Sequence, residues 1–124
     1  MSYEVHLSED GKYIVATHRG ELTHESVING TLEAHALGRK LGIKRHLMDV
    51  TEARNVDSVT TTYEFAHKEV RETPGIDKTV RVAVLVSPDD HTHDFSETVT
   101  RNAGQDVTIF RDREAAIRHL LSDM

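Results

Sequence analysis

The chain has 124 residues, of which 37% are hydrophobic and 29% charged, and its formal net charge at neutral pH is −6. This balance excludes a disordered chain and favours a single folded domain over residues 1–124. The acidic surface would repel a phosphate backbone, so we expect no nucleic-acid partner. The sequence lacks cysteine, which excludes disulfides. Its longest strongly apolar run, residues 80–86, is too short to cross a bilayer, and we expect a cytoplasmic protein.

The first twenty residues predict an antiparallel hairpin. Alternation over residues 3–7 places Tyr3, Val5 and Leu7 on one face of a strand. The SEDG segment at 8–11 is typical of a turn, and a second strand is predicted over 12–20.

A helix is predicted next, because the hydroxyl of Thr23 stands just before the carboxylate of Glu25 and Gly42 provides a stop. Apolar residues recur between them at helical spacing: Val27, Ile28, Leu32 and Leu41. His35 falls within the inward stripe of this helix, so we expect its ring to be half-buried and hydrogen-bonded.

The remainder of the chain alternates strands with helices. Strands are predicted over 45–50, 80–86 and 107–110, and helices over 59–72, 92–103 and 113–121. The strand at 80–86 is apolar on both faces, which is typical of an interior strand. The last helix should bury Ala116, Ile117, Leu120 and Leu121. The predicted fold is α/β, a five-stranded mostly parallel sheet with an N-terminal antiparallel hairpin and four helices.

Polar residues follow the predicted third strand. Asp49 is expected at the end of that strand, and Asp57 and Ser58 stand where the next helix should begin. Functional loops of parallel sheets gather beyond the carboxyl ends of the strands. The free N–H groups at a helix start donate hydrogen bonds either to a capping hydroxyl or to a phosphate.

Two local matches resemble the STAS family of anti-sigma-factor antagonist-like domains. The segment Gly20-Glu21-Leu22 resembles the family's Gly-Glu-Leu-Asp motif, and Asp49 followed by Asp57-Ser58 resembles its strand-end Asp and later Asp-Ser-Ser-Gly. The element order agrees over nearly the whole chain. Residues 107–120 resemble a divergent bacterial STAS-like branch, which shares its architecture with lipid-binding CRAL-TRIO domains.

The resemblance implies a role for Ser58. In members of the family the first Ser of the motif is phosphorylated, and the phosphate switches partner binding. Ser58 falls on that position and Asp57 on the acidic residue before it. Val59 and Thr60 stand where the family has Ser and Gly, so a plain helix cap is the alternative interpretation of Ser58.

Two histidines, His91 and His93, lie among aspartates in the segment PDDHTHD at 88–94. Imidazole and carboxylate ligands suit Zn, Ni or Cu. A histidine pair at i and i+2 in a loop is a weak signal for a metal site. Asp89 or Asp90 is also expected to cap the predicted helix that follows. We therefore predict no structural metal site and no cofactor.

An enzymatic interpretation fails on geometry. Ser58 and His67 would lie roughly 13 Å apart along one helix, whereas a base must approach its nucleophile to about 3 Å. The sequence also lacks a Gly-rich phosphate loop and a G-x-S-x-G elbow. We predict that the protein is not an enzyme.

Phe65 is predicted on the outer face of its helix, opposite the stripe that contains Tyr63, where an exposed aromatic can anchor an interface. The leading prediction is a non-catalytic protein-interaction or regulatory module that binds a partner or forms a homodimer. One alternative is a small apolar ligand or lipid in a pocket lined by His35 and Tyr63. Another is a serine phospho-switch at Ser58.

Overall fold

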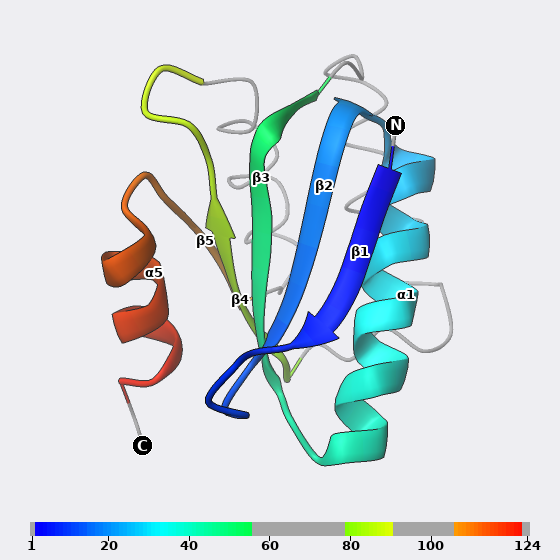
Figure 1. Cartoon of the computed structure of the whole chain (residues 1–124), viewed down its shortest axis with the longest axis vertical. Coiled ribbons are helices and arrows are strands. Elements are labelled where there is room, and N and C mark those ends of the chain that lie inside the picture. Colours follow the sequence, from blue (N-terminus) through cyan, green and yellow to red (C-terminus); the bar gives the residue numbers. More distant parts are fainter. Residues whose placement is uncertain (1, 56–78, 91–105, 123–124) are drawn as a thin grey trace.

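The computed structural model describes residues 2–55, 79–90 and 106–122. Five strands form one sheet in the order β1-β2-β3-β4-β5 (Figure 1). The pair β1–β2 is antiparallel and the other three pairs are parallel. The elements are β1 (Ser2–Leu7), β2 (Ile14–Leu22), α1 (His24–Leu41), β3 (Arg45–Asn55), β4 (Arg81–Leu85), β5 (Asp106–Phe110) and α5 (Arg113–Leu120).

This architecture confirms the predicted fold class. The hairpin, the parallel strands, the first helix and the last helix are present, and the helices predicted over 59–72 and 92–103 lie outside the described residues. Neither described helix combines the length and apolar character that a membrane span requires.

Helices α1 and α5 pack on opposite faces of the sheet (Figure 1). On the α1 side, Val84 and Val86 join one apolar cluster, with Val27 of the helix against it. On the α5 side, Ala83 and Leu85 join a second cluster that includes helix residues. The two-faced apolar pattern of 80–86 therefore belongs to an interior strand, as predicted.

The ends of α1 match the sequence prediction. Thr23 is the N-cap and forms a capping box with Ser26, in which each side chain accepts from the other residue's backbone N–H. Gly42 ends the helix in the left-handed conformation, with φ 71°. Glycine adopts this conformation without the steric penalty of a Cβ, so it stops the helix cleanly.

The inward face of α1 carries small residues at four-residue intervals. They are Ser26, Gly30, Ala34 and Gly38, and all four are buried. Residues four apart lie on one row of a helix, so this row presents little side-chain volume to the sheet. The rings of His18 and His46 approach it, at Gly30 and Gly38 respectively.

Strand β3 is longer than predicted, which corrects the expected position of Asp49. The predicted strand 45–50 continues to Asn55, and Asp49 lies inside it rather than at its end. Asp49 is level with Leu85, the last residue of β4. Beyond that level, within the described residues, β3 pairs with β2 alone. This pairing keeps the end of β3 extended, although that segment has little apolar character.

A β-bulge marks the start of this two-stranded extension. Between the pairs Thr17–Asp49 and Arg19–Glu52 the chain advances by two residues on β2 and by three on β3. The extra residue on β3 shifts the alternation of its side chains, so that Val50 and Ala53 both reach the α1-side cluster. The extension is therefore anchored in the core.

Helix α5 has Asp112 as its N-cap and buries Ala116 and Leu120, as predicted. Ile117 and Leu121 were expected to be buried as well, but both are half-buried. An eight-residue helix resting on one face of a sheet turns a single row of side chains inward, and these two residues flank that row.

Candidate functional site

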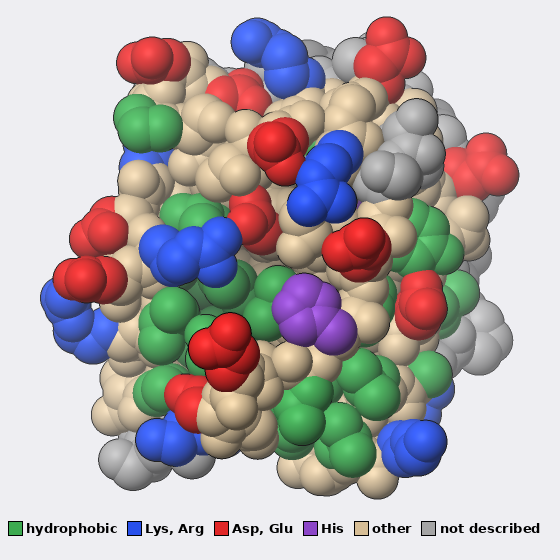
Figure 2. Space-filling view, in the orientation of Figure 1, with side chains coloured by type: hydrophobic (Ala, Val, Ile, Leu, Met, Phe, Trp, Pro, Cys, Tyr) green, Lys and Arg blue, Asp and Glu red, His purple; other side chains and the backbone are tan. Residues whose placement is uncertain are grey.

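The carboxyl ends of β2, β3, β4 and β5 lie toward the upper edge of the sheet in Figure 1. We define the carboxyl rim as residues 19–23, 49–55, 87–90 and 111–113. Its side chains are mostly polar or charged. The view in Figure 2 shows acidic and basic side chains interspersed over the upper half of one face.

Asp49 anchors the base of this rim. One carboxylate oxygen accepts from Arg113 Nη2 at 2.6 Å, and the other accepts from the backbone N–H and the hydroxyl of Thr51, at 3.0 and 2.8 Å. The Asp49 side chain is 10% exposed, whereas Arg113 is 53% exposed. The carboxylate therefore joins the bulge of β3 to the first turn of α5, and its described contacts are structural.

Two further bonds tie the loop after β4 to its neighbours. Ser87 Oγ donates to the carbonyl of Thr51 at 2.6 Å, and Arg111 Nη2 donates to the carbonyl of Asp90 at 3.1 Å. The loop is thus bound to β3 on one side and to the end of β5 on the other. These bonds give the rim a defined shape.

The two-stranded extension presents an exposed ion pair. Arg19 of β2 and Glu52 of β3 are paired in register, and Arg19 Nε lies 2.8 Å from Glu52 Oε2. Their side chains are 46% and 65% exposed. An exposed pair of this kind contributes little to stability but displays both signs of charge to an approaching molecule.

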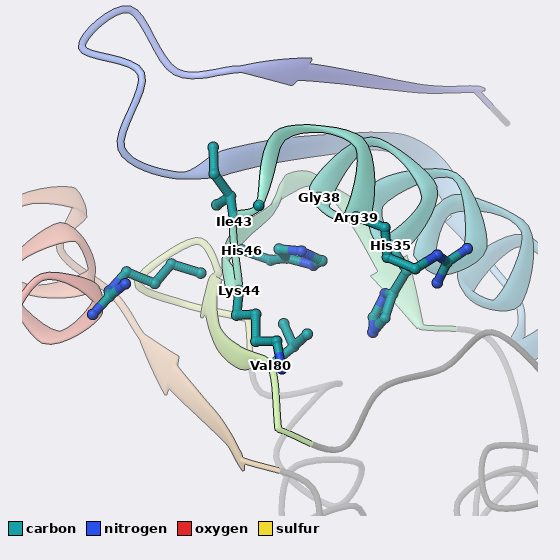
Figure 3. Close-up of a pocket in the computed structure, with 9 residues that line it drawn as sticks. His35, Gly38, Arg39, Ile43, Lys44, His46 and Val80 are labelled. Carbon is teal, nitrogen blue, oxygen red and sulfur yellow. The ribbon is translucent and has the colours of Figure 1, made fainter.

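A cavity of about 450 Å³ lies at the opposite edge of the sheet, where α1 ends and β3 and β4 begin (Figure 3). We call it the histidine pocket. Its lining is formed by His35, Gly38, Arg39, Gly42, Ile43, Lys44, Arg45, His46 and Val80.

Two imidazoles pack edge to face in this pocket. The ring centroids of His35 and His46 are 4.9 Å apart and their planes are inclined by 86°. Both residues are 4% exposed. His35 Nδ1 lies 2.8 Å from the carbonyl oxygen of Thr31. A carbonyl can only accept, so Nδ1 carries a proton and donates it. The predicted hydrogen bond of His35 is present, and the residue is more deeply buried than expected.

The pocket is basic in a chain whose net charge is −6. Lys44 Nζ donates to Thr79 Oγ1 at 3.0 Å, and Arg39 adds a second cation to the lining. Arg45 Nε donates to the carbonyl of Leu120 at 2.8 Å, so its guanidinium lies on the α5 side of the sheet. Ile43 and Val80 add apolar surface. This combination suits a ligand with an acidic group and a small apolar part.

The sequence-predicted site residues separate into three groups. Asp49 lies at the carboxyl rim and His35 in the histidine pocket, so the structure does not bring these two together. The remaining candidates lie outside the described residues: Asp57, Ser58, Tyr63, Phe65, His91 and His93. Within residues 2–55, 79–90 and 106–122 no three metal-ligating side chains cluster.

His46 and the nearby cations are not among the site residues predicted from the sequence. Residues 46, 48 and 50 alternate along β3 and share its α1-facing side, so the strand pattern places His46 on the same side as α1 and its His35. The run from Arg39 to Arg45 holds four of the chain's fifteen basic residues. The strand alternation and the basic run are both visible in the sequence, but neither is a known motif.

No family model matches this chain, and no curated protein matches it. Several solved structures resemble it, including two that match nearly the whole chain. One is an uncharacterized protein of the DUF3478 family from Shewanella loihica PV-4 with a SpoIIAA-like fold, at 19% identity and a TM-score of 0.55, over 96% of this chain and 92% of that one. The other is the anti-sigma factor antagonist SpoIIAA in its unphosphorylated form, at 14% identity and a TM-score of 0.53, over 99% of this chain and all of that one.

The fold is therefore SpoIIAA-like, and the resemblance to the STAS family is confirmed at the level of the fold. At these identities the likeness describes architecture alone.

Proposed function

We propose that this chain is a non-catalytic regulatory module of the cytoplasm that binds a protein partner through its carboxyl rim. The observation that carries the proposal is the match in fold, over essentially both whole chains, with a protein described as an anti-sigma factor antagonist. In folds of this kind, the loops at the ends of the strands are a common place for recognition.

The geometry of the rim supports this use. The extension of β2 and β3 presents Arg19 and Glu52 in exposed positions, while Asp49 and Arg113 hold its base to α5. A rigid base with exposed charges of both signs suits the recognition of another protein, because charge complementarity fixes orientation and speeds association. Asp57 and Ser58 follow the last residue of β3 by two and three positions. We include them, with Phe65, in the proposed partner surface.

The test uses charge reversal on the rim. Proteins captured by the purified chain from its source cells are identified by mass spectrometry, purified, and titrated against the wild type and the Arg19→Glu/Glu52→Arg variant. We expect the variant to bind its partner at least tenfold more weakly. Lys12→Glu is the matched control, because Lys12 is exposed in the β1–β2 turn at the other edge of the sheet. Equal affinity for the wild type and the rim variant would contradict the proposal.

The phospho-switch at Ser58 is a separate arm of the same proposal. Phosphate on Ser58, which is predicted to stand at a helix start, would change the charge that the partner meets. We expect Ser58→Asp and Ser58→Ala to differ in partner affinity by at least fivefold. Identical affinities would leave a plain capping role for the hydroxyl.

A second candidate function is the binding of a small ligand in the histidine pocket, which is favoured by the cavity itself. The sequence predicts a small apolar ligand or lipid beside His35 and Tyr63. Arg39 and Lys44 on the described lining favour an acidic ligand instead, with an apolar part against Ile43 and Val80. Calorimetry with short-chain carboxylates and with long-chain fatty acids separates these two classes. Arg39→Ala should weaken a carboxylate that binds here, and Arg54→Ala, an exposed arginine on β3, is the control.

A further inference from the structure

Strand β1 forms one edge of the sheet. Within the described residues it pairs with β2 on one side, and no other described strand lies along its outer side (Figures 1 and 3). Its register with β2 is unbroken from Ser2 to Leu7. The strand contains no proline, lysine or bulge, which are devices that commonly prevent edge strands from pairing with other chains.

The hydrogen-bonding phase of the hairpin shows which backbone groups face outward. Ser8 N–H donates to the carbonyl of Tyr13 at 2.8 Å, so this pair is hydrogen-bonded. Bonded and non-bonded pairs alternate along an antiparallel ladder. The pairs that Tyr3, Val5 and Leu7 form with residues of β2 are therefore the ones without hydrogen bonds between them. The N–H and C=O groups of these three residues point away from β2, toward the open edge.

The side chains of β1 are self-complementary about Val5. If a second β1 runs antiparallel with Val5 opposite Val5 of the partner subunit, Tyr3 faces Leu7 of the partner subunit on the α1 side of the sheet. On the other side, Glu4 faces His6 of the partner subunit. Aromatic–aliphatic and carboxylate–imidazole pairs are both favourable across strands, and the two-fold axis repeats each of them.

We propose that two copies of this chain associate through their β1 strands in this register, which joins the two five-stranded sheets edge to edge. The outward groups of Tyr3, Val5 and Leu7 then bond to Leu7, Val5 and Tyr3 of the partner subunit. Leu7, one of the two exposed large apolar residues of the described chain, at 38% exposure, becomes covered. The inference does not depend on the carboxyl rim or its partner.

We infer a second copy as the partner of this edge, because β1 is complementary to an antiparallel β1 at every position from residue 3 to residue 7. An unrelated peptide would match the backbone but would not be expected to match both the apolar and the charged pairs. A six-residue edge is a small interface, so the dimer should be reversible over roughly 10 μM to 1 mM. Light scattering and sedimentation equilibrium across that range measure it.

Val5→Pro tests the backbone contribution. The Val5 N–H points outward, so proline removes a bond to the second copy without removing a bond within the monomer. Val5→Thr is the matched control, because it changes the side chain and retains the N–H. We expect Val5→Pro to weaken dimerisation at least tenfold and Val5→Thr to retain it. Circular dichroism and thermal unfolding confirm that each variant is folded.

A charge exchange tests the register and decides the question if Val5→Pro fails to fold. His6→Glu sets a carboxylate opposite Glu4 of the partner subunit, twice per dimer, and should lower the dimer fraction at pH 7.5. Adding Glu4→Lys to it sets opposite charges across the strands and should restore dimerisation. The proposal would be overturned if the wild type stays monomeric up to 1 mM. It would also be overturned if His6→Glu leaves the dimer fraction unchanged, or if the double variant does not regain dimerisation.

Discussion

The imidazole of His18 lies against the backbone of Gly30, with the ring on β2 and the glycine on the inward row of α1. A Cβ at position 30 would come within 2.7 Å of His18 Cε1 and 2.9 Å of Nε2. The ring of Tyr3 packs on the same imidazole, with centroids 5.7 Å apart. His18 is 1% exposed. The ring therefore fills the space that the missing side chain of Gly30 leaves between helix and sheet.

Gly30→Ala should destabilise the fold, although alanine is the better helix former. Helix propensity would favour the change by about 1 kcal/mol. The added methyl group has to displace a buried ring, and overpacking of this kind costs about 1–3 kcal/mol. We expect a net loss of about 1 kcal/mol in the free energy of unfolding, measured by urea denaturation.

The same substitution in a His18→Ala background isolates the contact. Without the ring, the methyl group meets open space and the helix-propensity gain should remain, so Gly30→Ala becomes neutral or stabilising there. If Gly30→Ala destabilises both backgrounds equally, the contact with His18 is not the cause.

Stability should fall in mild acid because of His18. Burial lowers the pKa of this imidazole below its ordinary value of 6.5, so the unfolded chain binds a proton more readily than the folded chain. The contribution of the neutral ring is complete above pH 6.5 and is lost as the pH falls from there through the folded-state pKa. Urea denaturation between pH 5 and 8 should show wild-type stability rising with pH more steeply than that of His18→Gln.

Asp49 and Arg113 should contribute unequally to stability. Arg113→Ala removes a half-exposed partner and leaves the carboxylate bonded to Thr51, so we expect a loss of about 1 kcal/mol. Asp49→Ala also leaves the backbone N–H and the hydroxyl of Thr51 without their acceptor, so it should lower the free energy of unfolding by about 2 kcal/mol or more. A double-mutant cycle by urea denaturation measures the coupling. A coupling energy near zero would show that the 2.6 Å contact adds nothing in solution.

Two glycines near the end of α1 should respond differently to alanine. A Cβ on Gly38 would lie 2.6 Å from the carbonyl oxygen of Ile43 and 3.2 Å from His46 Nε2, whereas one on Gly42 would meet nothing within 4 Å. Gly42→Ala should cost about 1 kcal/mol, from its positive φ alone. Gly38→Ala should cost about 2 kcal/mol, because backbone must shift.

The histidine signals in nuclear magnetic resonance spectra distinguish these two effects. Gly38→Ala should move the resonances of His46, and Gly42→Ala should leave them in place. Unchanged His46 resonances in the Gly38 variant would contradict the close packing at this end of the helix.

The sequence alone predicted the elements whose signals are local. Thr23 and Gly42 mark the ends of α1 by their own side-chain and backbone chemistry, and the alternating faces of residues 80–86 follow from the period of a strand. These features depend on neighbours within a few residues, so pattern and propensity suffice to find them.

Features that depend on distant partners were missed. Residues 51–55 contain one apolar residue, Ala53, and they form a strand because residues 19–22 pair with them. The contact of His35 with His46 joins a helix to the following strand through the fold. Periodicity places His35 and His46 on facing sides of the two elements, but it does not give the register that brings the two rings together. The predicted position of Asp49 was wrong for a related reason, because the end of β3 depends on its pairing with β2.

The row of small residues on α1 has a consequence for how this sequence can diverge. Gly30 has no room for a side chain while position 18 holds an imidazole, whereas the space at Gly38 is limited by the backbone carbonyl of Ile43. In related chains positions 30 and 18 should therefore covary, with a larger residue on the helix accompanied by a smaller one on the strand. Such paired exchanges would let distant relatives be recognised even where every motif has drifted.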